Sequence, residues 1–214
     1  MRLCNFTNKD IFRLNFKLIS LITTVSVTML FSLVDQTVWG AVIICPVGVA
    51  VCNGTAADDI IRGTTGDALI QGLGGNDFIR GYLYGNNYIF GDDGDDILIG
   101  GYYNDGIYGG NGNDKYDGFE GDDTIYEVFH ILGSFVNNND IISGGLGNDH
   151  ISSGEGSDRI HAGQGNDHIA PNPYYRDFSS DIVNCGLGVD GVGLFNSGDG
   201  DTALNCENIF NPDQ

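Results

Sequence analysis

Three consecutive nonapeptides decide the fold: GGLGNDHIS (144–152), SGEGSDRIH (153–161) and AGQGNDHIA (162–170). With the places of each unit numbered as columns one to nine, Gly recurs in columns two and four, Asp in column six and Ile in column eight. One apolar side chain in nine residues is too sparse for a helix face, but it suits a short strand with one inward side chain. The glycines permit the positive φ angles of a tight turn.

The same frame extends over most of the chain, at 54–62, 63–71, 72–80, 91–99, 100–108, 109–117, 118–126, 135–143, 176–184 and 185–193. Six turn residues and three strand residues make half a coil, so two repeats complete one coil of about 18 residues. Successive coils stack as parallel strands about 4.8 Å apart. The sequence therefore predicts an all-β fold, a parallel β-roll (β-solenoid) over residues 54–193 with two repeats per coil.

Four stretches depart from the frame. Ala68 replaces the Asp of column six, and block 81–90 has one residue too many, with Asn86 and Asn87 at this place. Residues 127–134 form a degenerate unit with no acid in column six, and residues 171–180 are predicted to form a loop.

Stacking predicts where cations bind. Asp residues 18 apart in sequence would face each other across adjacent coils, as Asp59/Asp77, Asp96/Asp114, Asp105/Asp123, Asp140/Asp158 and Asp149/Asp167. Carboxylates held this close resist ionising unless a cation lies between them. Ca²⁺ prefers carboxylate and carbonyl oxygens, whereas Zn²⁺ or Cu²⁺ would call for more imidazole or thiolate. We therefore expect several Ca²⁺ ions, with Asp59, Asp77, Asp96, Asp105, Asp114, Asp123, Asp140, Asp149, Asp158 and Asp167 as metal ligands.

The units GGNGNDKYD (109–117), GGLGNDHIS (144–152) and GLGGNDFIR (72–80) resemble the GGxGxDxUx repeat of the RTX (repeats-in-toxin, haemolysin-type) calcium-binding proteins. The resemblance implies a β-roll with Ca²⁺ in its turns, held by the column-six Asp and by main-chain carbonyls. The segment from Cys185 to Glu207 also resembles the closing segment of small exported members. RTX toxins typically leave the cell through a C-terminal signal, whereas this chain has the features of an N-terminal one.

The first forty residues differ in kind from the rest. Four basic residues precede an uncharged apolar run at 18–34, and small residues follow at Gly40 and Ala41. This pattern predicts a signal peptide over residues 1–40 and a secreted, extracellular protein, with cell-surface association as a further expectation. An uncleaved membrane anchor is the alternative, because the run is at the short end of the roughly 17 to 25 residues that span a bilayer. If the signal is cleaved, no stable membrane span is expected.

The net charge of the chain limits the classes of partner that it can bind. The chain has 29 acidic and nine basic residues, a net charge of −20, which excludes nucleic acid or an anionic membrane surface as an electrostatic partner. Calcium ions are therefore the leading partners, and an extracellular or cell-surface polysaccharide is a further candidate.

The cysteines predict how the roll ends. An even number remains after the signal peptide, which favours disulfides in an exported protein. The preferred pairing is Cys45–Cys52 in an N-terminal cap (41–53) and Cys185–Cys206 closing a C-terminal cap (194–214). A zinc site is the alternative, but no CxxC motif or Cys/His cluster supports it.

Catalytic motifs are missing from the sequence: it contains no HExxH, no GxSxG and no P-loop. We therefore expect a non-catalytic structural or binding module that folds when Ca²⁺ binds. An adhesin or polysaccharide-binding protein is the alternative, motivated by the tyrosines of residues 82–108, and a polysaccharide-modifying enzyme is a third hypothesis. His150 and His168, which share a column, are read as outward polar side chains, with a transition-metal site as the alternative.

Overall fold

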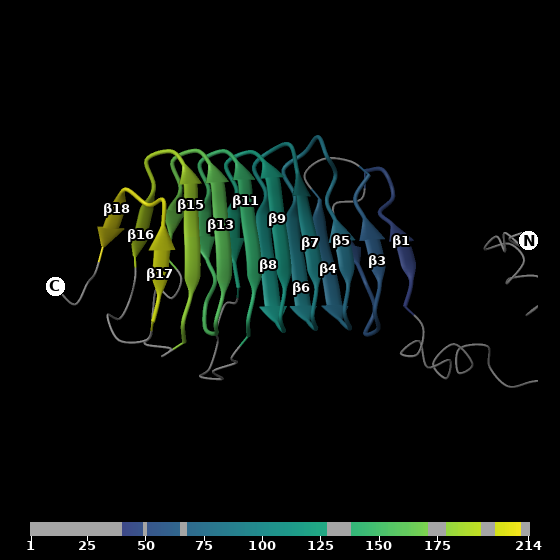
Figure 1. Ribbon diagram of the computed structural model, residues 1–214. Coiled ribbons are helices and arrows are strands. Elements are labelled where there is room, and N and C mark those ends of the chain that lie inside the picture. Colours follow the sequence, from purple (N-terminus) through teal and green to yellow (C-terminus); the bar gives the residue numbers. More distant parts are fainter. Residues whose placement is uncertain are drawn as a thin grey trace, which may run out of the picture. The chain divides into compact units, whose positions relative to one another are not determined.

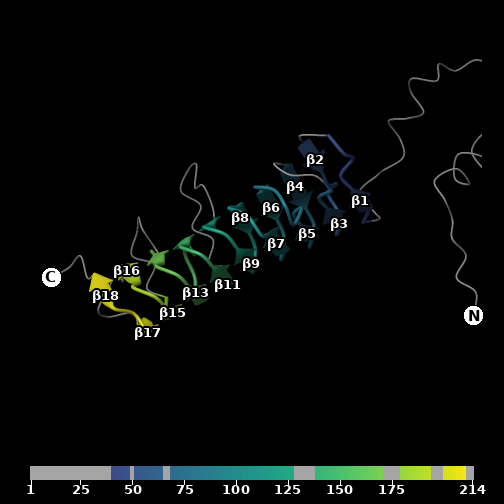
Figure 2. The ribbon, with the colours of Figure 1, turned by 90° about the horizontal axis from the view of Figure 1, so that it is seen from above.

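The computed structural model describes residues 40–48, 51–64, 68–127, 138–170, 179–193 and 200–210. These residues form a β-solenoid in which the chain passes alternately through two parallel sheets (Figures 1 and 2). Each sheet has nine strands, and each coil contributes one strand to each sheet. The predicted all-β parallel β-roll with two repeats per coil is confirmed.

The two sheets contain alternate strands of the chain. Sheet A runs in the order β1 (Val42–Ile44), β3 (Ile60–Arg62), β5 (Phe78–Arg80), β7 (Ile97–Gly101), β9 (Lys115–Glu120), β11 (Ile141–Leu146), β13 (Arg159–Gln164), β15 (Ile182–Leu187) and β17 (Thr202–Leu204). Sheet B runs in the order β2 (Val51–Asn53), β4 (Leu69–Gly74), β6 (Tyr88–Asp93), β8 (Gly106–Asn111), β10 (Thr124–Tyr126), β12 (His150–Ser152), β14 (His168–Ile169), β16 (Gly191–Gly193) and β18 (Asn208–Phe210).

The register places each column against itself in the next coil. Ile61 is opposite Ile79 in sheet A, and Ile151 is opposite Ile169 in sheet B. The column-eight side chains therefore stack between the two sheets and form the core. Burying one isoleucine contributes roughly 1.5–3 kcal/mol, and each coil obtains this only from its neighbours, which makes stacking cooperative.

Several strands are longer than the three residues expected. Strands β11 and β13 each have six residues, and their pairing continues beyond column nine, with Gly145 opposite Gly163 and Leu146 opposite Gln164. The extra residues are columns one to three of the next repeat. The column-one residue faces inward like column eight, and the strand continues through the positive-φ residue of column two and ends before the positive-φ residue of column four.

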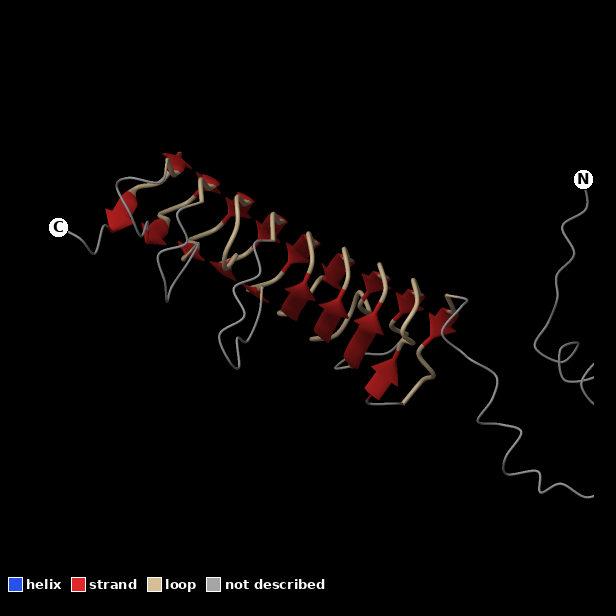
Figure 3. Cartoon of the chain, turned by 90° about the horizontal axis from the view of Figure 1, so that it is seen from below, coloured by secondary structure: helices blue, strands red, loops and turns tan. Residues whose placement is uncertain are grey.

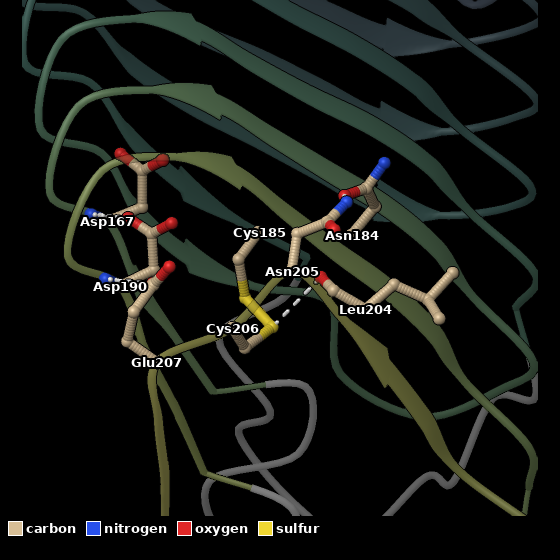
Figure 4. Close-up of a disulfide and its surroundings, with 8 residues drawn as sticks. All are labelled: Asp167, Asn184, Cys185, Asp190, Leu204, Asn205, Cys206 and Glu207. Carbon is tan, nitrogen blue, oxygen red and sulfur yellow. Dashed lines mark hydrogen bonds between the residues drawn. A yellow bond between two sulfur atoms is a disulfide. The ribbon is translucent and has the colours of Figure 1, made fainter.

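Both predicted disulfides are present, and they bind the two ends of the roll. Cys52 occupies the column-eight place opposite Ile70, and it pairs with Cys45 across the first coil. Cys185 in β15 pairs with Cys206, which follows β17 in the next coil (Figure 4). The regions predicted as caps contribute β1, β2, β17 and β18 to the two sheets, and the exact domain boundaries remain predictions.

Some predicted segments fall outside the described residues: the signal peptide up to residue 39, residues 128–134 of the degenerate unit and residues 171–178 of the predicted loop. Over the described ranges, the chain has no helix long and apolar enough to cross a membrane.

Candidate metal centre

The column-six aspartates lie where each turn enters the next strand, with their side chains inside the roll. All ten predicted metal ligands are at most 3 % exposed. The turns that carry them connect the two rows of strands (Figure 3). We call the turns that lead from sheet B into sheet A the first edge, and those that lead from sheet A into sheet B the second edge.

The first edge carries a continuous ladder of carboxylates. In each coil the main-chain N–H of the column-six residue donates a hydrogen bond to Oδ1 of the column-six Asp in the following coil. The donor–acceptor pairs are Asp59–Asp77 (2.7 Å), Asp77–Asp96 (2.7 Å), Asp96–Asp114 (2.8 Å), Asp114–Asp140 (2.7 Å), Asp140–Asp158 (2.8 Å), Asp158–Asp181 (2.9 Å) and Asp181–Asp201 (2.9 Å). Ala41 N–H begins the series by donating to Asp59.

The second edge carries a shorter ladder of the same kind. Its pairs are Asn87–Asp105 (2.6 Å), Asp105–Asp123 (2.8 Å), Asp123–Asp149 (2.8 Å), Asp149–Asp167 (2.8 Å), Asp167–Asp190 (2.9 Å) and Asp190–Glu207 (3.0 Å). Figure 4 shows its last three acids, Asp167, Asp190 and Glu207, one beyond the other. Ala68 has no carboxylate, so the acids of this edge begin at Asp105.

All five predicted pairs are brought together, and the ladders join further pairs that the spacing rule missed. Asp114 meets Asp140 and Asp123 meets Asp149, 26 residues apart, while Asp158 meets Asp181, 23 residues apart. The register of the sheets continues past the irregular segments, so a fixed spacing of 18 finds only part of each ladder. The signal that could have found Asp201 and Glu207 is the apolar residue two places after each of them, Ala203 and Ile209, in the column-eight place.

In most members of the two ladders, one buried carboxylate oxygen has no donor. Among the described residues, Oδ2 has no hydrogen-bond partner in Asp77, Asp96, Asp105, Asp123, Asp140, Asp149, Asp167 and Asp190. A buried acceptor without a donor costs roughly 1–3 kcal/mol, and more when it is charged. Such a cost repeated along both edges indicates a missing positive group.

The pKa values of these acids also show that ionisation is unfavourable at these buried places. Burial raises the pKa of Asp96 to about 8; the N–H of Asp77 lowers it, and the carboxylates of Asp114 and Asp77 raise it. Burial likewise raises the pKa of Asp123 and Asp140 to about 8. Without a counter-ion, these carboxyls therefore hold their protons near neutral pH.

Beside Oδ2 of Asp77, Asp96, Asp105, Asp123 and Asp149, a small space is kept open by the glycine of column one. A Cβ added to Gly91 would collide with Oδ2 of Asp96 and would lie 2.5 Å from the carbonyl oxygen of Gly109 in the next coil. A carboxylate and a main-chain carbonyl therefore converge on one space from which side chains are absent. Oxygen atoms of these two kinds are the ligands that Ca²⁺ takes at about 2.3–2.6 Å.

The acids alone do not complete a coordination shell. Nowhere in the described ranges do three or more His, Cys, Asp or Glu side chains form a group that could hold a metal ion. A bound Ca²⁺ would therefore draw further ligands from the main chain, as the sequence predicted. The residues present fit a hard divalent cation, and the imidazole and thiolate ligands of a zinc site are not gathered at either edge.

A second, outer ladder of column-five side chains was not predicted. On the second edge, the N–H of Asn148 donates to Asp122 at 2.7 Å, and the N–H of Asn166 donates to Asn148 at 2.8 Å. On the first edge, Asp95 and Asn113 make the equivalent contact at 2.8 Å. These side chains are exposed, so they align the turns without adding buried charge. The recurrence of Asn or Asp before the column-six Asp was the available signal.

Glu127 is a buried acid that the sequence analysis did not single out. It occupies the column-one place after β10, where most of the earlier turns have Gly. Its carboxylate accepts hydrogen bonds from the Asn138 amide (2.7 Å) and the Glu155 N–H (3.0 Å). Burial and then the charges of Asp140 and Asp158 raise its pKa to about 9. It adds a further acid to the first edge.

His150 and His168 lie on the outer face of sheet B, with their rings stacked at a centroid distance of 4.9 Å. Burial and then the neighbouring His168 lower the pKa of His150. Neither belongs to a metal-binding group of the described residues.

Comparison with known proteins agrees with this geometry. The family model of the RTX calcium-binding nonapeptide repeat matches four segments, at residues 53–83, 83–101, 90–125 and 136–169. No curated protein matches the chain. The four segments together span half of the sequence, and they contain the turns of both ladders from Asp59 to Asp167. The chain therefore belongs to the RTX calcium-binding nonapeptide repeat family.

Proposed function

We propose that this protein is an exported, non-catalytic calcium-binding module whose β-roll folds when Ca²⁺ binds along its two edges. The observation that carries the proposal is the row of buried Oδ2 atoms without donors in Asp77, Asp96, Asp105, Asp123, Asp140, Asp149, Asp167 and Asp190. Bound Ca²⁺ supplies positive charge that lets neighbouring carboxylates ionise together. The predicted ligands from Asp59 to Asp167 would hold it, together with main-chain carbonyls.

Folding and binding are coupled because the acids converge only in the stacked roll. In the unfolded chain the same residues are separated by 18 or more positions, so the unfolded chain offers no formed site. A ligand that binds only the folded state stabilises it in proportion to the logarithm of its concentration over Kd. Extracellular calcium modules bind with Kd of roughly 10⁻⁴–10⁻³ M, so the roll is expected to fold after export.

Export is supported by the sequence and by the cysteines. The two disulfides fit an oxidising compartment. The signal-peptide pattern in residues 1–40 would direct the chain into the export pathway.

The non-catalytic part of the proposal is supported by the repeats, which account for most of the acidic residues that a catalytic site would otherwise use.

The test is a calcium titration of the purified chain followed by circular dichroism. We expect a gain of β signal at millimolar Ca²⁺, reversal by chelator, and little effect of Mg²⁺, which resists replacing its waters with a protein cage. A chain whose β signal is the same with calcium and with chelator at pH 8 would disprove the proposal.

A second candidate function, polysaccharide binding, has one specific observation in its favour. The side chains of columns seven and nine on sheet B, all within the described residues, include no Asp, Glu, Lys or Arg. On this face the ring of Tyr88 lies against Gly106, and Tyr88 is 55 % exposed. Phe90 and Tyr108 stack on each other at 4.7 Å, so their facing surfaces are covered. An open aromatic ring among the uncharged side chains of these two columns suits a neutral sugar.

A glycan array probed in the presence of Ca²⁺ tests this second function. Binding is expected to be lost in Tyr88→Ala and kept in Tyr103→Ala, which removes an exposed tyrosine in a turn. Silence of the calcium-loaded protein across neutral glycans would remove this candidate.

A further inference from the structure

The turn at 81–87 is built differently from the other turns of the second edge. It has seven residues, and its column-six member is Asn87, because Asn87 N–H donates to Oδ1 of Asp105 at 2.6 Å and Gly106 N–H donates to the Asn87 carbonyl at 2.8 Å. The sequence left open whether Asn86 or Asn87 takes this place. The Asn87 side chain is completely buried.

The amide nitrogen of Asn87 lies among three oxygen atoms. It is 3.0 Å from the carbonyl oxygen of Tyr82, 2.9 Å from that of Gly85 and 2.9 Å from Oδ1 of Asp105. The amide oxygen accepts the Tyr82 N–H at 3.1 Å. Two main-chain carbonyls and a carboxylate from the next coil therefore converge on one partially positive group, and both ends of the amide are satisfied.

The amide takes the place that a carboxylate oxygen takes elsewhere. A Cβ added to Gly81 would lie 2.7 Å from the Asn87 amide nitrogen, whereas a Cβ added to Gly91 would collide with Oδ2 of Asp96. Oδ2 of Asp96 has no donor among the described residues, while the nitrogen of Asn87 is itself a donor. In turn 81–87 the Asn87 amide makes the hydrogen bonds that complete the turn. In the turn of Asp96, no positive group faces the corresponding carboxylate oxygen.

We propose that the Asn87 amide replaces a calcium ion, so that turn 81–87 takes no cation and keeps β4, β6 and β8 stacked when calcium is absent. The proposal rests on the calcium binding proposed above and adds that the turns are not equivalent. The previous turn of the same edge ends in Ala68, which also lacks a carboxylate. The Cys45–Cys52 disulfide binds the coil before it. On the second edge no column-six carboxylate precedes Asp105, so the N-terminal coils depend on calcium only at their first edge and form the seed on which the more calcium-dependent coils stack.

The test replaces one amide by a carboxylate. Asn87→Asp converts the turn into the type seen at Asp96, with a buried oxygen that lacks a donor. Native mass spectrometry is expected to count one more Ca²⁺ per chain in Asn87→Asp than in the natural protein. Hydrogen exchange in chelator at pH 8 is expected to show that protection in β4, β6 and β8, retained in the natural chain, is lost in the variant and returns with Ca²⁺.

The matched control is Asn166→Asp, which adds the same charge at an exposed column-five place and keeps the acceptor for Val189 N–H. It is expected to leave the calcium count and the protection pattern unchanged. Asn87→Ala removes the donor without supplying a ligand, so it is expected to lose protection in chelator and gain no ion.

An unchanged calcium count in Asn87→Asp, or equal protection of β4, β6 and β8 in all variants under chelator, would overturn the inference. An Asp variant that stays unfolded in calcium would also contradict it. If the natural protein binds no Ca²⁺ at all, the proposed function fails; if it binds Ca²⁺ and Asn87→Asp gains none, only the role of Asn87 fails.

Discussion

The two edges of the roll differ in how far their carboxylates extend. The first edge has an Asp in column six from Asp59 to Asp201, whereas the second edge begins with Ala68 and Asn87 and has acids only from Asp105 onward. Both edges have the same register and the same backbone ladder. The difference shows that the stack accommodates a turn without a column-six carboxylate, because the Asn87 amide hydrogen-bonds that turn instead.

The comparison also explains why acids are used at most turns. At most column-six places the carboxylate leaves Oδ2 without a donor, whereas both ends of the Asn87 amide have hydrogen-bond partners. Under the proposed function, the acids make the fold conditional on calcium, and the amide frees its turn from that condition.

The largest expected effect is the loss of calcium at pH 8. The coils from Asp105 onward have acids on both edges, so chelator is expected to abolish most hydrogen-exchange protection in β9 to β16. Protection is expected to persist longest in β4 and β6, beside Asn87. A uniform loss of hydrogen-exchange protection across all strands would contradict the proposed difference between the N-terminal and the central coils.

Acidification is expected to replace part of the calcium effect. Carboxyls whose folded pKa is raised bind more protons in the folded state than in the unfolded state, where the pKa is about 4. The stability of the metal-free roll is therefore fully present below pH 4 and falls as pH rises through the folded values of about 6 for Asp77 and about 8 for Asp96 and Asp123. Urea denaturation in chelator between pH 4 and pH 8 measures this.

Calcium affinity is expected to change in the opposite sense. Protons compete for the same carboxylates, so the apparent affinity should rise between pH 5 and pH 8. A metal-free stability that rises with pH over this range would contradict the burial of the ladders.

Asp123→Asn is expected to move the second edge toward the behaviour of Asn87. The amide gives a donor in place of the unpartnered Oδ2, so the metal-free roll should gain about 1–3 kcal/mol at pH 8. The calcium count should fall. Asp122→Asn is the control, because this exposed neighbour keeps its acceptor for Asn148 N–H. Equal effects of the two substitutions on unfolding in chelator would show that only total charge matters.

A glycine substitution in a turn of the first edge is expected to lower the free energy of unfolding both with and without calcium. Gly112 has a φ of 137°, and a Cβ added to it would collide with the carbonyl oxygen of Gly94 in the previous coil. Gly112→Ala should cost roughly 1–3 kcal/mol by overpacking. Gly74→Ala is the control, since its nearest contact would be 3.7 Å away. Denaturation midpoints in calcium and in chelator should move together for Gly112→Ala.

The smallest expected effect concerns the outer ladder. Asn148→Ala removes the acceptor for Asn166 N–H and the donor to Asp122, both in exposed turns. Water replaces these partners, so we expect a loss of about 0.5–1.5 kcal/mol in unfolding free energy with no change in calcium count. A lower calcium count in this variant would place column five in the coordination shell.

Part of the site was predictable and part was not, for reasons visible in particular residues. Asp149 and Asp167 are 18 apart with complete repeats between them, and they meet as predicted. Asp114 and Asp140 are separated by a degenerate unit, so counting residues does not pair them, although the strands do. Asn86 and Asn87 are chemically identical, and only the extra residue in their turn decides which one enters the roll.

The class of fold and the chemistry of the edges follow from the sequence alone. An apolar residue in column eight and an acid in column six repeat often enough that only a stack of short parallel strands satisfies both. The tertiary structure decided which acids are neighbours, which oxygen of each carboxylate lacks a donor, and that one turn is closed by an amide. These three features depend on distances between neighbouring coils. The register of the sheets sets those distances, and the spacing of residues along the chain does not.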